Sequence, residues 1–155
     1  MKIIKSTTLT KPQKEAICFL WNREYPRQLM MSQDEFDIYL EKLQAPNHFL
    51  VLDDVNEVVG WACTFDRDED RWFLILINSL YQRLGIGRMV LRLLKEKETR
   101  LNGWVIDHPH DVKQNGEAYE SPLRFYVKNG FDVMPEIRYT NDKIAAVKIE
   151  WKNNQ

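Results

Sequence analysis

The chain has 155 residues, of which 44% are hydrophobic and 29% charged, and its formal net charge is −1 at pH 7. This near-neutral balance is typical of a globular protein and gives no support to bulk binding of nucleic acid or of an anionic membrane. No apolar run approaches the roughly 20 residues of a membrane span, and the first residues lack the apolar core of a secretory signal. We therefore expect one domain over residues 1–155, in the cytoplasm, with no nucleic acid or membrane partner.

The first third of the chain predicts one strand and two helices. A strand over residues 2–8 precedes a helix that starts at Thr10, a capping residue, and ends before Pro26. A capping box at 32–35 starts a second helix, which we expect to end at Pro46.

The rest of the chain predicts six further strands and two helices. The strand candidates are short runs rich in β-branched and aromatic residues: 48–52, 58–65, 72–77, 104–107, 131–134 and 145–151. An amphipathic helix starts at Gly85 and is expected to stop at Asn102 and Gly103, and another runs from Ser121 to Asn129. This order of elements predicts an α/β domain with a mixed sheet.

The two cysteines, Cys18 and Cys63, lie in apolar surroundings without the spacing of metal ligands. We expect both to be small buried thiols, outside any disulfide framework or metal site.

A glycine-spaced loop joins the apolar strand 72–77 to the helix that starts at Gly85. The first N–H groups of a helix have no partner inside the helix, and its dipole is positive there, so such a loop can bind phosphate. A P-loop is excluded because Arg88 follows Gly87 where that motif has lysine, and a Rossmann fingerprint because Val90 replaces its third small residue. A tight turn without a ligand stays open as the alternative.

This loop, through Gln82, Gly85 and Gly87, resembles the coenzyme A pyrophosphate loop of the Gcn5-related N-acetyltransferases, the GNAT family. The downstream segment 125–131, with its tyrosine and its glycine-phenylalanine exit, is similar to the helix-end segment of the same family. The resemblance implies a mixed, mostly antiparallel central sheet that is splayed between strands 4 and 5 and flanked by helices. It also implies acetyl-CoA as co-substrate without a metal, a primary amine of a small molecule or peptide as acceptor, and a homodimer as one option.

The resemblance places coenzyme contacts at the end of the fourth strand, in the loop and on the later helix. The expected contacts are Leu76, Ile77, Asn78, Gln82, Arg83, Leu84, Gly85, Ile86, Gly87, Arg88 and Tyr126. The Ile77 amide is expected to donate a hydrogen bond to the thioester oxygen. Tyr126 is expected to be the general acid, since a phenol with a pKa of about 10 stays neutral at pH 7 and can protonate a thiolate whose conjugate thiol has a pKa of about 8.5.

The sequence offers several candidates for the base that deprotonates the amine and for the acceptor contacts. The strand 72–77 carries no acid, so a common family position for a glutamate base is empty. The remaining candidates are two bases and three acceptor contacts: Asp107 and His108, and Glu24, Tyr25 and His110. All five are equally consistent with ordinary loop residues.

The chain departs from the family pattern in two places, and other functions stay open. Tyr119 stands where many members have asparagine, and the polar segment 108–120 is long, so we expect this segment to shape the acceptor site. The missing strand acid keeps a second function open, that of a catalytically weak coenzyme A-binding sensor or interaction module, although the intact Tyr126 and loop argue against it. A third alternative is a dinucleotide-binding oxidoreductase domain, which would bind nicotinamide and not coenzyme A.

Overall fold

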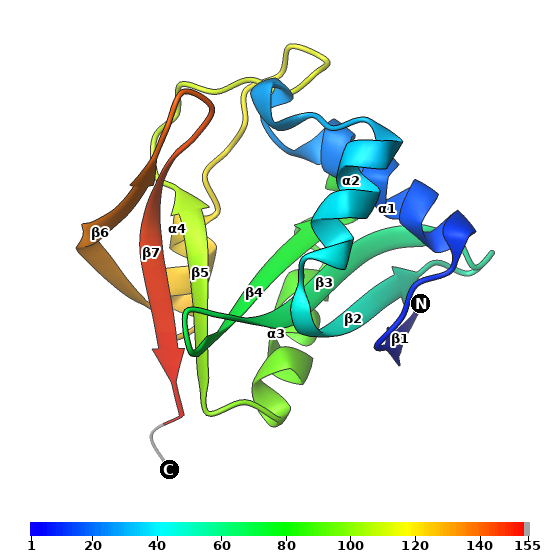
Figure 1. Cartoon of the computed structure of the whole chain (residues 1–155), viewed down its shortest axis with the longest axis horizontal. Helices are drawn as coiled ribbons and strands as arrows, with labels where there is room; N and C mark the ends of the chain where they lie inside the picture. Colours follow the sequence, from blue (N-terminus) through cyan, green and yellow to red (C-terminus); the bar gives the residue numbers. More distant parts are fainter. Residues whose placement is uncertain (154–155) are drawn as a thin grey trace.

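The computed structural model describes residues 1–153 and shows one seven-stranded sheet with helices on both faces (Figure 1). The strands are β1 (Lys2–Ser6), β2 (Gln44–Leu52), β3 (Val58–Arg67), β4 (Asp70–Ile77), β5 (Arg100–Ile106), β6 (Asp132–Thr140) and β7 (Ala145–Lys152). The helices are α1 (Lys11–Glu24), α2 (Gln33–Glu41), α3 (Ile86–Glu96) and α4 (Leu123–Lys128), with short 3₁₀ turns η1 (Arg27–Leu29) and η2 (Ser79–Tyr81). The predicted mixed α/β class is confirmed.

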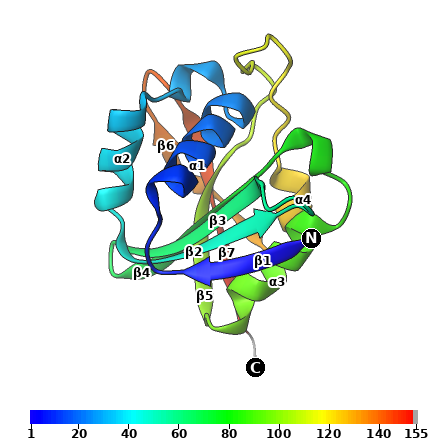
Figure 2. The same ribbon diagram turned by 90° about the vertical axis from the view of Figure 1, so that its right-hand side faces the viewer.

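The strand order across the sheet is β1-β2-β3-β4-β5-β7-β6. Neighbouring strands are antiparallel except β4 and β5, which are parallel. Helices α1 and α2 pack on one face of the sheet, through residues such as Leu20 and Phe36, and α3 and α4 pack on the other, through Val90 and Tyr126 (Figure 2). The two helix pairs therefore approach the β4–β5 junction from opposite sides.

The helix starts follow the local signals in the sequence. The Thr10 hydroxyl accepts from the Gln13 amide and the Gln13 side chain accepts from the Thr10 amide, which together cap α1. Ser32 and Glu35 form the same reciprocal pair at the start of α2. Each pair satisfies helix N–H groups that would otherwise be unpaired. The two free cysteines are buried, as expected.

The expectation that Pro46 ends the second helix is wrong. Helix α2 ends at Glu41, and Pro46 lies inside β2, at the point where the register with β3 shifts between Gln44 and Asn47. Proline donates no ladder hydrogen bond, and it is tolerated in a strand where such an irregularity interrupts the pairing.

Asn102 and Gly103, expected to stop the third helix, lie inside β5 instead. The buried Asn102 side-chain amide donates to the Arg71 carbonyl at 2.9 Å. A Cβ on Gly103 would lie 2.9 Å from the ring of Phe73, so only glycine allows this approach of β4 and β5. Both residues therefore serve strand contacts, and the helix ends earlier, at Glu96.

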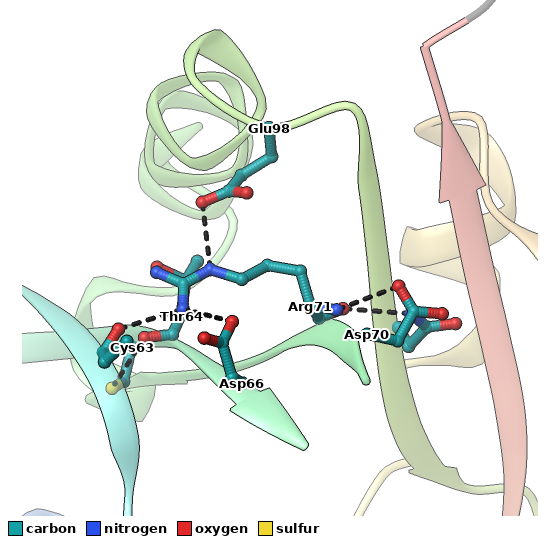
Figure 3. A network of polar contacts seen from close by, with 8 residues as sticks. Cys63, Thr64, Asp66, Asp70, Arg71 and Glu98 are labelled. Atoms are coloured by element: carbon teal, nitrogen blue, oxygen red, sulfur yellow. Dashed lines mark hydrogen bonds and ion pairs between the residues drawn. The ribbon is translucent and has the colours of Figure 1, made fainter. Parts of the chain in front are cut away.

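One half-buried arginine ties together the end of the sheet where β4 begins (Figure 3). Arg71 donates through Nε to Glu98 at 3.1 Å and through Nη2 to the buried Thr64 hydroxyl at 3.0 Å. Its Nη1 donates to Asp66 at 3.0 Å and to the Ala45 carbonyl at 2.9 Å. These contacts link β2, β3, β4 and the loop after α3, and they lie at the opposite end of β4 from Ile77.

Replacing Arg71 with methionine should lower the free energy of unfolding by about 2–3 kcal/mol, because Thr64 and Glu98 lose charged hydrogen bonds in a poorly solvated place. Urea denaturation measures this loss. Arg100→Met is the matched control: it removes a more exposed pair with Asp70 and should cost less than about 1 kcal/mol. Equal losses in the two variants would contradict the structural role of Arg71.

Candidate active site

A gap opens between β4 and β5 toward their carboxyl ends, as Figure 1 shows. The two strands share one register pair, Trp72 with Asn102, near the start of β4. Beyond that pair the strands diverge, so the splay that the resemblance implied is confirmed. The divergence leaves backbone groups of β4 without a strand partner on this side, and such groups can pair with an extended ligand.

The ladder between β3 and β4 shows which backbone groups of β4 face the gap. The Asn78 amide donates to the Val59 carbonyl at 2.9 Å. Because backbone groups alternate in direction along an antiparallel strand, the amides of Ile75 and Ile77 point away from β3, into the gap. The amides of Leu76 and Asn78 point toward β3, so of the three expected strand contacts only Ile77 offers its N–H to a ligand.

The glycine loop ends at the start of α3, and its two glycines have different roles. Gly85 is the N-cap of α3, with φ of +82°, open space around its Cβ position and no side-chain cap for the helix. A Cβ on Gly87 would lie 3.1 Å from the Phe125 ring, so Gly87 allows α3 to pack against α4. Uncapped amides at a helix start, with the exposed Arg83 and Arg88 nearby, suit a phosphate group.

A cleft of about 630 Å³ occupies the gap and receives side chains from both faces of the sheet. The expected site residues that line it are Glu24, Tyr25, Leu76, Ile77, Gln82, Arg83, Gly85, Gly87, Arg88 and Tyr126. Glu24 and Tyr25 come from the end of α1 on one face, whereas the glycine loop and Tyr126 belong to the α3 and α4 face. Two substrates can thus meet in this cleft from opposite sides of the sheet.

Tyr126 lies in the wall of the cleft and is 6% exposed. Its ring makes edge contacts with Phe73, Phe125 and Phe131, at centroid distances of 5.5, 5.2 and 5.4 Å. Burial raises the pKa of the Tyr126 phenol above its usual value, with a smaller contribution from Tyr119. The phenol therefore keeps its proton at neutral and moderately alkaline pH, as a general acid must.

The α1 side of the cleft holds a buried carboxylate. Glu24 accepts from the Ser79 amide at 3.0 Å through Oε2 and from Lys113 Nζ at 3.2 Å through Oε1. The rings of Tyr25 and Tyr119 face each other nearby, with centroids 6.4 Å apart. Burial raises the pKa of both phenols, so Tyr25 and Tyr119 are uncharged side chains beside the pair formed by Glu24 and Lys113.

The candidate bases and His110 do not line the cleft. Arg138 on β6 holds Asp107 through two hydrogen bonds, at 2.9 and 3.0 Å, and these bonds lower the pKa of the Asp107 carboxyl. His108 lies 3.7 Å from Asp111 and its ring stacks on His110. The structure therefore places these three residues around the end of β5, apart from the cleft wall.

Three expected coenzyme contacts also lie outside the cleft lining: Asn78, Leu84 and Ile86. Asn78 uses its side chain to accept from the Leu80 amide and so caps η2. Ile86 is the first residue of α3 and its side chain is buried in the core, whereas the Leu84 side chain is exposed.

The segment 113–122 contributes cleft residues, as expected of a segment that shapes the acceptor site, but the sequence singled out only Tyr119 among them. The segment supplies Lys113, Glu117, Ala118, Tyr119, Glu120, Ser121 and Pro122. A β-bridge between Pro26 and Lys113 docks the segment on the turn after α1, and another between Val112 and Ala118 closes it into a small hairpin. The length of the polar stretch and the unusual Tyr119 were the only signals in the sequence. The docking contacts join residues 26–28 to residues 111–113, which lie far apart in the chain.

A family model for the acetyltransferase (GNAT) domain matches residues 45–133, which is more than half of the chain. The chain belongs to the GNAT acetyltransferases. The predicted family and enzyme class are thereby confirmed. No curated protein matches this acetyltransferase significantly.

Solved structures share the fold of this GNAT acetyltransferase at low sequence identity. A GNAT phosphinothricin acetyltransferase from Sinorhizobium meliloti, in complex with acetyl-CoA, has a TM-score of 0.69 at 12% identity, over 98% of this chain and 89% of that chain. A spermidine N-acetyltransferase variant from Vibrio cholerae has a TM-score of 0.63 at 16% identity, over 98% and 95%. AAC(6')-Ib in complex with ribostamycin and coenzyme A has a TM-score of 0.63 at 13% identity, over 99% and 94%.

Two features are absent from the part of the acetyltransferase that the structure describes. Within residues 1–153, no helix is long and apolar enough to cross a membrane. The same residues contain no group of three or more histidine, cysteine or acidic side chains arranged to hold a metal ion.

Proposed function

We propose that this protein transfers an acetyl group from acetyl-CoA to a primary amine of a small molecule or peptide, with the whole chain acting as one acetyltransferase domain. One observation carries the proposal. A buried, neutral Tyr126 and the free amide of Ile77 lie in a single cleft, between an uncapped helix start and the buried carboxylate of Glu24.

The residues of the cleft suit the parts of the coenzyme. The α3 amides, with Arg83 and Arg88, would hold the pyrophosphate, because both the helix dipole and the guanidinium groups favour negative charge there. The gap-facing backbone of Ile75 would pair with a pantetheine amide, as a strand pairs with a sheet edge. The Ile77 carbonyl already accepts from Gln82 Nε2 at 2.9 Å, and the Ile77 amide stays available for the thioester. The acetyl-CoA and coenzyme A in two structural neighbours support this assignment.

The chemistry follows from where charge develops. The acceptor ammonium first loses one proton to water, since a lysine-like amine has a pKa of about 10.4 and is protonated at neutral pH. The neutral amine then attacks the thioester carbon, so that a C–N bond forms and the C–S bond breaks. The Ile77 amide would donate to the carbonyl oxygen as it becomes negative. Tyr126 would give its proton to the departing sulfur and recover one from the amine nitrogen, which leaves the enzyme unchanged after the reaction. Glu24 would hold the amino group of the acceptor beside this centre.

Incubation with acetyl-CoA and a panel of amines tests the proposal. Release of free thiol together with an acetylated amine, identified by mass, would support it. Tight coenzyme A binding without turnover on any amine would favour the sensor alternative. Binding of nicotinamide nucleotides with no thermal shift from coenzyme A would favour the oxidoreductase alternative. The cytoplasmic location and the homodimer stay predictions.

A further inference from the structure

Glu24 and Lys113 form a buried ion pair in the wall of the cleft. Their side chains are 4% and 14% exposed, and Lys113 Nζ lies 3.2 Å from Glu24 Oε1. By contrast, Arg83 and Glu120 at the rim, 3.5 Å apart, are 86% and 81% exposed. Arg23, which is 35% exposed and does not line the cleft, also lies 3.5 Å from Glu24, through its Nε and the Oε2 of Glu24. On the Oε1 side of Glu24, the cleft therefore offers a ligand one desolvated negative charge beside one desolvated positive charge.

Other contacts besides this pair hold the segment around Lys113 in place. The Arg27 amide donates to the Val112 carbonyl at 2.9 Å, and Gln28 donates to Asp111 at 2.8 Å. These bonds, with the bridge to Pro26, dock the segment on the turn after α1 without using either charge. A buried ion pair rarely adds much net stability, because desolvation of the two charges offsets their attraction. A role toward a ligand therefore explains the pair better than a role in folding.

The pair selects for a ligand that carries both charges. A zwitterion can enter between Glu24 and Lys113, with its ammonium on the carboxylate and its carboxylate on the ammonium, so each protein charge stays compensated. A polycation would meet the ammonium of Lys113 and a carboxylate that is already neutralised. A simple amine bound to Glu24 would leave the buried ammonium of Lys113 without a negatively charged partner.

The other oxygen of Glu24 sets where the amino group would lie. It accepts from the Ser79 amide at 3.0 Å, two residues after Ile77, whose own amide faces the gap. An ammonium held by Glu24 therefore lies close to the end of β4, where the thioester is expected. The neutral rings of Tyr25 and Tyr119 enclose this side of the cleft.

We infer that the acceptor is an amino acid-like zwitterion, with a carboxylate adjacent to its primary amine, and that Lys113 binds the carboxylate while Glu24 holds the amine. This inference rests on the proposed function. It assigns Lys113 as a residue that determines specificity.

The test uses matched sets of acceptors: free L-amino acids, the same amino acids as carboxamides, the corresponding decarboxylated amines, and spermidine. In the wild-type protein, kcat/KM for the best free amino acid should exceed that for its carboxamide and decarboxylated amine by roughly 10- to 100-fold, the effect of one charged hydrogen bond. Lys113→Met should remove this preference, Lys113→Arg should keep most of it, and Lys42→Met, an exposed lysine away from the cleft, should leave it unchanged.

The preference is a ratio within each variant, so a lower folded fraction does not affect it. Calorimetric binding of the same ligands in the presence of coenzyme A gives a second ratio that does not need turnover. Equal values for acid, carboxamide and amine in the wild type, a preference for spermidine, or an unchanged ratio in Lys113→Met would overturn the zwitterion inference. Absence of acetylation with every acceptor, while the binding ratio persists, would count against the proposed function alone.

Discussion

Replacing Tyr126 with phenylalanine should lower kcat by at least about 100-fold, because the departing thiolate loses its proton donor. The dissociation constant of coenzyme A should stay within about threefold, since the ring keeps its edge contacts with Phe73, Phe125 and Phe131. Single-turnover kinetics with acetyl-CoA, beside calorimetry with coenzyme A, separates the two effects. A variant with unaltered kcat would remove Tyr126 from the mechanism.

The raised pKa of Tyr126 adds a condition on pH. A phenol acts as an acid only while protonated, and burial moves its pKa above the usual value of about 10, so any loss of kcat from its ionisation should begin above that pH. Tyr139→Phe, which changes a half-exposed tyrosine on β6, is the control and should keep full activity. If kcat changed with pH near neutrality, the ionisation of a group other than Tyr126 would have to cause that change.

Replacing Ile77 with proline should lower kcat by about 100- to 1,000-fold, the usual effect of removing one hydrogen-bond donor to a developing oxyanion. Proline has no N–H, and the N–H of Ile77 points into the gap and not into the ladder with β3. The sheet should therefore survive the change. Activity and thermal melting, measured on the same preparation, check both halves of this expectation.

Two matched variants isolate the role of the amide. Ile77→Ala removes the side chain, which packs against Gly60, but keeps the N–H, so it should lose stability but little of kcat. Leu76→Pro removes a ladder hydrogen bond to β3 and should prevent folding. If Ile77→Ala and Ile77→Pro lost activity equally, the amide would have no catalytic role.

The parts of the fold that follow from neighbouring residues were predictable. The capping pairs at Thr10 and Ser32 are local hydrogen bonds, and the structure has both. The stop at Asn129 and Gly130 also holds, since Gly130 takes a φ of +89° directly after α4. Pro46 and Gly103 misled the prediction because their partners lie on other strands. Proline and glycine usually mark loops or the ends of elements. Here Pro46 lies at a register shift between β2 and β3, and Gly103 lies against the ring of Phe73.

The sequence by itself determined the family and the glycine loop before α3, because both depend on contiguous residues whose backbone geometry is set locally. Glu24 and Tyr25 were expected on the acceptor side, but only the tertiary structure decided which residues they meet there. It brought Lys113 to Glu24, 89 positions away in the chain, and it engaged Asp107 with Arg138 on β6. Such pairs join charged side chains from distant segments, and no local pattern records which segments will meet. The loop that resembles a phosphate site therefore leads to a cleft in which the pair we propose for specificity, Glu24 and Lys113, belongs to no motif.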